Sequence, residues 1–186
     1  MTDHFARLGV PRASWLDPEV LKARFLALSA ETHPDKAAGS KQKAEEEFRS
    51  LNESYQILRN TRLRILHFLE LQGVARPDHV QAIPPIALDL FSSIADVTRK
   101  SDALLKEKAA AKSPMLQVQF FEIALPCVDS IQALHCEVQN RMRTVDSDLQ
   151  RFSSGEIQKL QQAAAALGFL EKWQAQLQER AAALSF

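Results

Sequence analysis

The sequence predicts an all-α protein built from two helical units, with four helices in the first unit and three longer ones in the second. Three observations carry this prediction. Only 5 glycines and 8 prolines occur among 186 residues, so the chain makes few turns. Apolar residues recur at steps of three and four, the period of a helix that faces a core. Three of the prolines fall between residues 74 and 85, where this pattern breaks.

Capping residues and prolines predict the ends of the first two helices. Phe5 and Leu8 mark a single turn of helix closed by Gly9. The segment 17–19 (Asp-Pro-Glu) combines an N-cap residue, a proline at the first helical position and an acid in the first turn. We expect this second helix to end near Thr32, because a proline follows two residues later.

A polar loop over residues 35–43 separates these helices from the next two. The third helix is predicted from Ala44 and the fourth from residue 62 to residue 72, where Gly73 ends it. The face of the third helix that we assign to the core carries four apolar residues: Phe48, Leu51, Tyr55 and Leu58. The predicted organisation is a first domain over 1–73, a linker over 74–85 and a second domain over 86–186.

The second domain is predicted to be an antiparallel bundle of three helices. The first helix carries an apolar stripe at Leu90, Ile94 and Val97, and Ser113 with Pro114 starts the second. Pro126 is expected to kink this second helix or divide it in two. Ser153 and Glu156 fit a capping box for the last helix. The two long helices have these seam residues: Ile131, Leu134, Val138, Met142, Val145, Leu149 and Phe152, then Leu160, Leu167, Leu170, Leu177 and Leu184.

Composition excludes several functions. The 23 basic residues equal the 23 acidic ones, whereas a general nucleic-acid binder has a basic excess. With 46% hydrophobic and 25% charged residues, the chain is not a disordered one. No apolar run reaches the length of a membrane span and no leader pattern opens the chain. We therefore expect a cytoplasmic protein that binds neither nucleic acid nor membrane.

The tripeptide His33-Pro34-Asp35 is the most informative motif. Proline keeps the backbone extended after the second helix, so an imidazole and a carboxylate are presented to solvent, where a carboxylate suits an arginine of a partner. One histidine and one aspartate are too few to bind zinc, and no nucleophile or second acid accompanies them. The sequence contains no Cys-x-x-Cys pair. We predict no catalytic residue, no metal site and no cofactor. The remaining histidines are dispersed along the sequence and receive no role: His4, His67, His79 and His135.

A short helix, a proline-started helix, this tripeptide with Lys36, a polar loop and an apolar third helix together resemble the J-domain of DnaJ-type co-chaperones over residues 4–73. The segment 51–59 (LNESYQILR), followed by Arg64, Leu69, Leu71 and Gly73, is similar to the end of the J-domain in the HscB family of iron–sulfur co-chaperones. The C-terminal segment 169–186 also resembles the last helix of that family.

The resemblance implies a function and its residues. A J-domain binds a DnaK-type chaperone and triggers its ATP hydrolysis, so His33, Pro34, Asp35 and Lys36 would be the trigger, with Lys22 and Arg24 on the second helix as further contacts. HscB proteins carry an IscU-like scaffold protein to the chaperone HscA through their C-terminal bundle. The positions that match the scaffold-binding surface are Leu90, Phe91, Ile94 and Phe169.

Two features limit what the resemblance implies. The glutamates that accompany this surface in the family are absent, since Ala95 and Thr98 stand nearby. Leu90, Ile94 and Phe169 also fit a bundle core, whereas Phe91 lies off their stripe. Two alternatives therefore stay open: a J-domain co-chaperone of a general DnaK with another client, or a structural helical adaptor with a vestigial J-domain. An enzyme is not predicted.

Overall fold

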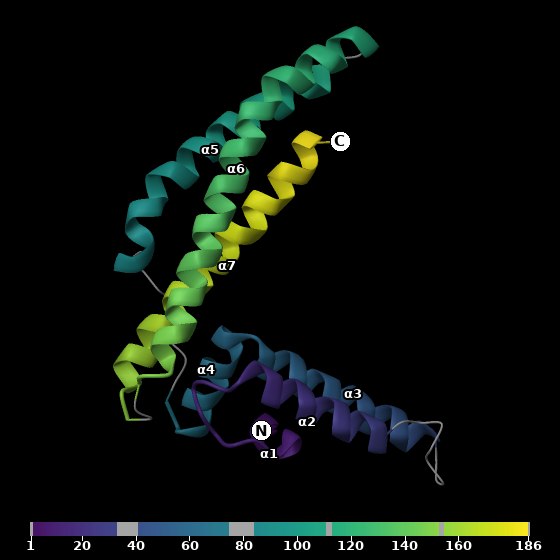
Figure 1. Ribbon diagram of the computed structural model, residues 1–186, viewed down its shortest axis with the longest axis vertical. Coiled ribbons are helices and arrows are strands. Elements are labelled where there is room, and N and C mark those ends of the chain that lie inside the picture. The colour runs from purple at the N-terminus through teal and green to yellow at the C-terminus, as the bar shows by residue number, and fades with distance from the viewer. Residues whose placement is uncertain (1, 33–40, 75–83, 111–112, 153–154, 186) are drawn as a thin grey trace. The chain divides into compact units, whose positions relative to one another are not determined.

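The computed structural model describes residues 2–32, 41–74, 84–110, 113–152 and 155–185. Within these ranges the chain forms seven α-helices and no strand (Figure 1). The predicted all-α class is confirmed. The chain divides into two compact units: the first unit comprises residues 1–79 and 146–164, and the second unit comprises residues 80–145 and 165–186. None of the described helices is both long and apolar enough to cross a membrane.

The first unit begins with four helices: α1 (His4–Leu8), α2 (Pro18–Glu31), α3 (Lys41–Arg59) and α4 (Thr61–Leu71). The ends of α1 and α2 follow the predicted signals, and α4 begins and ends one residue earlier than predicted. Gly9 ends α1 in the left-handed conformation, with φ of 61°. The carboxylate of Asp17 accepts the backbone N–H groups of Glu19 and Val20 as the N-cap of α2. Thr32 caps the other end of α2, as the following proline predicts.

Helix α3 corrects the prediction at two points. It begins at Lys41, three residues before Ala44. Phe48 is 37% exposed and not part of the core, so that assignment is wrong. The buried face of α3 runs through Leu51, Ser54 and Leu58, which turns Phe48 toward solvent. Because serine is polar, the apolar pattern could not include Ser54.

The second unit is built on three long helices: α5 (Pro85–Ala110), α6 (Pro114–Leu149) and α7 (Ile157–Ser185). The predicted stripe of α5 and all five seam leucines of α7 are buried. Helix α6 continues through Pro126, so of the two predicted effects of this proline, a kink or a division, the division does not occur. Ala124 and Cys127, on either side of the proline, are buried in the core and hold both halves of the helix against their neighbours.

The last turn of α6 and the first part of α7 belong to the first unit. Of the predicted capping box, Ser153 lies outside the described residues, and Glu156 directly precedes α7. Residues 75–83 of the predicted linker also lie outside them, and the domain boundaries at 73 and 86 stay a prediction.

Candidate functional site

The trigger motif follows directly after the described part of α2. His33, Pro34, Asp35 and Lys36 lie outside the described residues. At the end of α2, both the backbone N–H and the hydroxyl of Thr32 donate to the carbonyl of Leu28, at 3.0 and 2.9 Å. These two bonds close the last turn of the helix at the residue before the motif.

The two basic residues predicted on α2 differ in their surroundings. The guanidinium of Arg24 donates to the carbonyl of Gly9 at 3.4 Å, which ties α2 to the end of α1. Lys22 is exposed and forms no ion pair with any described residue. Of the two, Lys22 is therefore the freer to meet an acidic partner.

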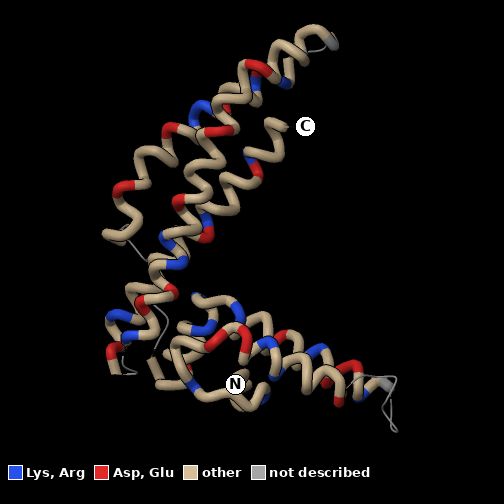
Figure 2. The backbone as a smooth tube through the Cα atoms, viewed as in Figure 1, with Lys and Arg blue, Asp and Glu red and all other residues tan. Residues whose placement is uncertain are grey.

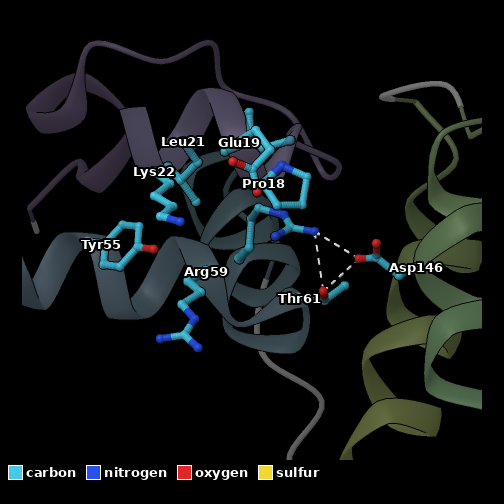
Figure 3. A pocket seen from close by; sticks show the side chains of 10 residues that line it. Pro18, Glu19, Leu21, Lys22, Tyr55, Arg59, Thr61 and Asp146 are labelled. Atoms are coloured by element: carbon cyan, nitrogen blue, oxygen red, sulfur yellow. Dashed lines mark hydrogen bonds and ion pairs between the residues drawn. The ribbon is translucent and has the colours of Figure 1, made fainter. Parts of the chain in front are cut away.

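Lys22 lines a cavity of about 400 Å³ in the first unit, and sequence reasoning missed this cavity. Figure 3 shows Lys22 on α2 with Tyr55 and Arg59 on α3 at one side of it. Arg59 is exposed and, within the described chain, has no ion-pair partner either. The ring of Tyr55 stacks on Phe25, with centroids 4.2 Å apart, which fixes the wall of the cavity.

Arg64, one of the residues that carry the resemblance to HscB, also lines this cavity and is a buried cation. Its side chain donates to the carbonyls of Ser14 and Leu58, each at 2.9 Å. It also donates to the carboxylate of Asp146 at 3.2 Å, a bond that is dashed in Figure 3. Burial lowers the pKa of Arg64, and the charge of Asp146 opposes this shift. These bonds join the loop before α2, the end of α3 and the end of α6 within the first unit.

Two of the histidines that we treated as dispersed are neighbours in the fold. The rings of His4 and His67 lie 4.6 Å apart, and the backbone N–H of His4 donates to Nε2 of His67 at 3.1 Å. Nδ1 of His4 is 3.0 Å from the hydroxyl of Ser54, which itself donates to the carbonyl of Ser50. Burial lowers the pKa of both histidines. The pair holds α1 against α3 and α4.

In the second unit the four predicted scaffold-binding residues separate into two groups. Leu90 and Ile94 are buried in the core, at 7% and 4% exposure. Phe91 is half-exposed, and Phe169 is partly buried. Their ring centroids lie 6.5 and 6.1 Å from that of the buried Trp173, so both rings neighbour the same tryptophan.

Leu88, one turn before Phe91, is 61% exposed and was missed by sequence reasoning. Its spacing of three residues from Phe91 was the available signal. We define the aromatic surface as Leu88, Phe91 and Phe169 over Trp173. Nearby, Arg141 on α6 bonds to Asp89 and to the carbonyl of Ile86 at 2.7 and 3.1 Å, which anchors the start of α5.

The described residues form neither a large charged patch nor a metal site. Lys and Arg are mixed with Asp and Glu along the helices (Figure 2), and the longest run of one sign is Glu45, Glu46 and Glu47 in α3. Among the residues that the structure describes, no group of three or more His, Cys, Asp or Glu side chains could hold a metal ion.

Comparison with known proteins gives the class. Residues 3–66 match the DnaJ domain family. DnaJ of Campylobacter hominis is 42% identical over 64 residues, which are 34% of this chain and 17% of that protein. Residues 3–66 therefore make this chain a J-domain protein, and a J-domain implies an Hsp70-type chaperone as partner.

The similarity to HscB extends much further. Co-chaperone HscB of Proteus mirabilis is 29% identical over 132 residues, covering 65% of this chain and 76% of that protein. The HscB homologue of Azoarcus is 25% identical over 189 residues, covering 98% and 95%. The structure of HscB from Vibrio cholerae has the same fold, with a TM-score of 0.59 at 18% identity over 96% of both chains. The chain is a J-domain co-chaperone of the HscB type.

Proposed function

We propose that this chain stimulates the ATPase of a DnaK/HscA-type chaperone and delivers an IscU-like iron–sulfur scaffold protein to it. The observation that supports this proposal best is the similarity to HscB proteins along 98% of the chain, which includes both units. A J-domain that served only as a trigger would need no matching C-terminal bundle.

The first half of the proposal concerns docking on the chaperone. The motif His33-Pro34-Asp35 with Lys36 would contact the chaperone directly after the closed end of α2. An exposed aspartate forms its strongest hydrogen bonds with an arginine, and such bonds are roughly twice as strong as neutral ones. Lys22 and the neighbouring Arg59 would add positive charge near the start of α2, about 15 Å along the helix from Thr32, whereas Arg24 is engaged with the carbonyl of Gly9.

The second half concerns the scaffold. The aromatic surface offers Phe91, half-exposed above a buried tryptophan, and such rigid aromatic groups typically dominate binding energy at interfaces. Leu90 and Ile94 lie beneath in the core, so they would shape this surface and not contact the scaffold directly. Leu88 extends the surface along α5.

Single-turnover ATP hydrolysis by the chaperone tests the proposal. The parent chain should accelerate hydrolysis, and the scaffold should increase the effect further. Asp35→Asn should remove the acceleration, with or without scaffold, while circular dichroism shows unchanged helix content. Asp17→Asn, which keeps an N-cap oxygen on α2, is the matched control and should stimulate like the parent.

The two alternative functions predict different outcomes of this ATPase experiment. Stimulation of a general DnaK without any effect of the scaffold would identify a J-domain co-chaperone with another client. Undiminished stimulation by Asp35→Asn would contradict the role of the motif as the trigger. No stimulation of any Hsp70-type chaperone by the parent chain would favour the structural adaptor.

A further inference from the structure

The first half of α6 carries a second apolar stripe, opposite the face that enters the core. The buried face comprises Phe120, Ala124, Cys127 and Ile131. The opposite face is formed by side chains that are 75%, 64%, 53% and 47% exposed: Met115, Val118, Phe121 and Leu125. At 100° per residue these four positions fall within an arc of about 120°. We call them the outer stripe.

The outer stripe lies in a segment with almost no charge. Between Ser113 and Val128 the only charged residue is Glu122. The rest of α6, from Asp129 to Leu149, has six: Asp129, Glu137, Arg141, Arg143, Asp146 and Asp148. A helix face that remains in water normally carries charges, as the second half of α6 does. The first half has an apolar composition on its outer side as well as on its inner side.

The exposed apolar area of the outer stripe is large enough for a protein–protein interface. Its four side chains expose on the order of 400 Å² together, which is already as large as the largest patch on a typical monomer. If two copies of the stripe met, they and the residues between them would bury about 1,000 Å², near the lower limit for specific protein–protein interfaces.

We propose that the outer stripe pairs with the outer stripe of a second copy of this chain, in a symmetric dimer. A symmetric interface brings identical surfaces together, so like charges on the surface would repel each other. This segment contributes one carboxylate per copy, whereas the second half of α6 would contribute six charged groups. The steps of three and four between stripe residues are those of a seam between paired helices.

The dimer would leave the aromatic surface accessible. The ion pair between Arg141 and Asp89 places the start of α5 beside residue 141 of α6. That position is 16 residues beyond Leu125, or about 24 Å along the helix. Dimerisation and scaffold binding would therefore use separate parts of the second unit.

Sedimentation velocity of the full chain over a wide concentration range tests the proposal. We expect the mass to rise from that of one chain, 20.9 kDa, to that of two. Phe121→Ser should raise the dissociation constant about tenfold or more, since it removes a large apolar contact from each copy. The control is Leu26→Ser on α2, which also removes an exposed side chain, 55% accessible, and should leave association unchanged.

A crosslinking experiment gives an independent readout. Glu122→Cys places a thiol in the middle of the stripe, and Cys136→Ser removes the exposed native cysteine. A bifunctional maleimide should then link two chains, and Phe121→Ser should suppress the link. A chain that stays monomeric at every concentration would overturn the proposal. So would a dimer that Phe121→Ser leaves intact while circular dichroism shows a folded variant. Protection of Glu122→Cys only by added chaperone or scaffold would assign the stripe to that partner instead and also overturn it.

Discussion

The two units differ in how polar groups enter their interiors. Four of the five polar residues that are buried in the described chain lie in the first unit: Ser14, Ser54, Arg64 and His67. In the second unit the corresponding residue is Ser101, whose hydroxyl donates to the carbonyl of Thr98 on its own helix. Buried polar contacts between distant segments therefore help to hold the first unit together, whereas the second unit is held together mainly by buried apolar area. The two units should respond differently to mutation, acid and salt.

The largest expected effect is on the stability of the first unit. Arg64→Met would leave the buried carbonyls of Ser14 and Leu58 without their charged donor, which should reduce the free energy of unfolding by about 3 kcal/mol. Denaturant unfolding in a Trp173→Phe background, where Trp15 reports on the first unit alone, would measure the loss. Arg59→Met removes an exposed cation of the neighbouring helix and should change stability by less than about 0.5 kcal/mol. Equal effects of the two substitutions would contradict the role of Arg64.

The second prediction concerns apolar area in the second unit. Phe91→Ala should weaken binding of the scaffold about tenfold or more, because a buried phenylalanine contributes about 1.5–3 kcal/mol. Titration calorimetry against the scaffold would measure this change, and unchanged thermal unfolding would show that the fold is intact. Phe48→Ala removes a side chain that is also exposed, but in the first unit, and should bind like the parent. If Phe91→Ala binds normally, the aromatic surface is not the scaffold site.

Acid should destabilise the first unit before the second. The pKa of His4 and that of His67 are lowered from 6.5 in the folded protein, while in the unfolded chain they return to that value. As the pH falls below 6.5, the unfolded state therefore binds protons first, and stability is lost as the pH falls through the lowered folded values. The acidic groups near the pair, Asp3, Glu53 and Glu70, moderate the shift without reversing its direction.

The fluorescence of Trp15 and that of Trp173 can measure this acid effect in each unit separately. The unfolding transition seen by Trp15 should move to a lower denaturant concentration between pH 7 and pH 5. His67→Gln should reduce this shift, because glutamine does not titrate. Its amide oxygen still offers an acceptor to the backbone N–H of His4, so the fold should be kept. Trp173, observed in a Trp15→Phe background, should change less. A larger shift at Trp173 would reverse the comparison between the units.

The smallest expected effect is that of salt on scaffold binding. The aromatic surface is apolar, so the affinity for the scaffold should change by less than about twofold between low and physiological ionic strength. Docking on the chaperone through Lys22, Asp35 and Lys36 relies on charge and should weaken more over the same range. Both affinities can be measured by calorimetry in one salt series. A steeper dependence for the scaffold would show that charges outside the aromatic surface contribute to its binding.

The sequence alone predicted features that depend on neighbouring residues. Asp17, Gly9 and Thr32 define helix ends through bonds that reach at most four residues, so their patterns are visible in the chain. The seam leucines of α7 are likewise all buried as the spacing predicts.

Features that depend on distant residues were not predictable. His4 and His67 are 63 positions apart, and Arg64 reaches an aspartate 82 positions away. Lys22 and Arg59 share a cavity only because α2 and α3 pack together. Ser54 enters the core because His4 and the carbonyl of Ser50 satisfy its hydroxyl, and this shift of the buried face moved Phe48 out of it.

The assignment of residues 146–164 to the first unit has a consequence for its autonomy. A fragment that ends at Gly73 would contain the whole J-domain motif but not its complete compact unit. Arg64 would keep its two carbonyl acceptors and lose the carboxylate of Asp146, which pairs with it in the full chain. We therefore expect a fragment over residues 1–73 to be less stable than the same residues in the full chain. For transplantation onto another protein, residues 146–164 should be included to restore the compact unit.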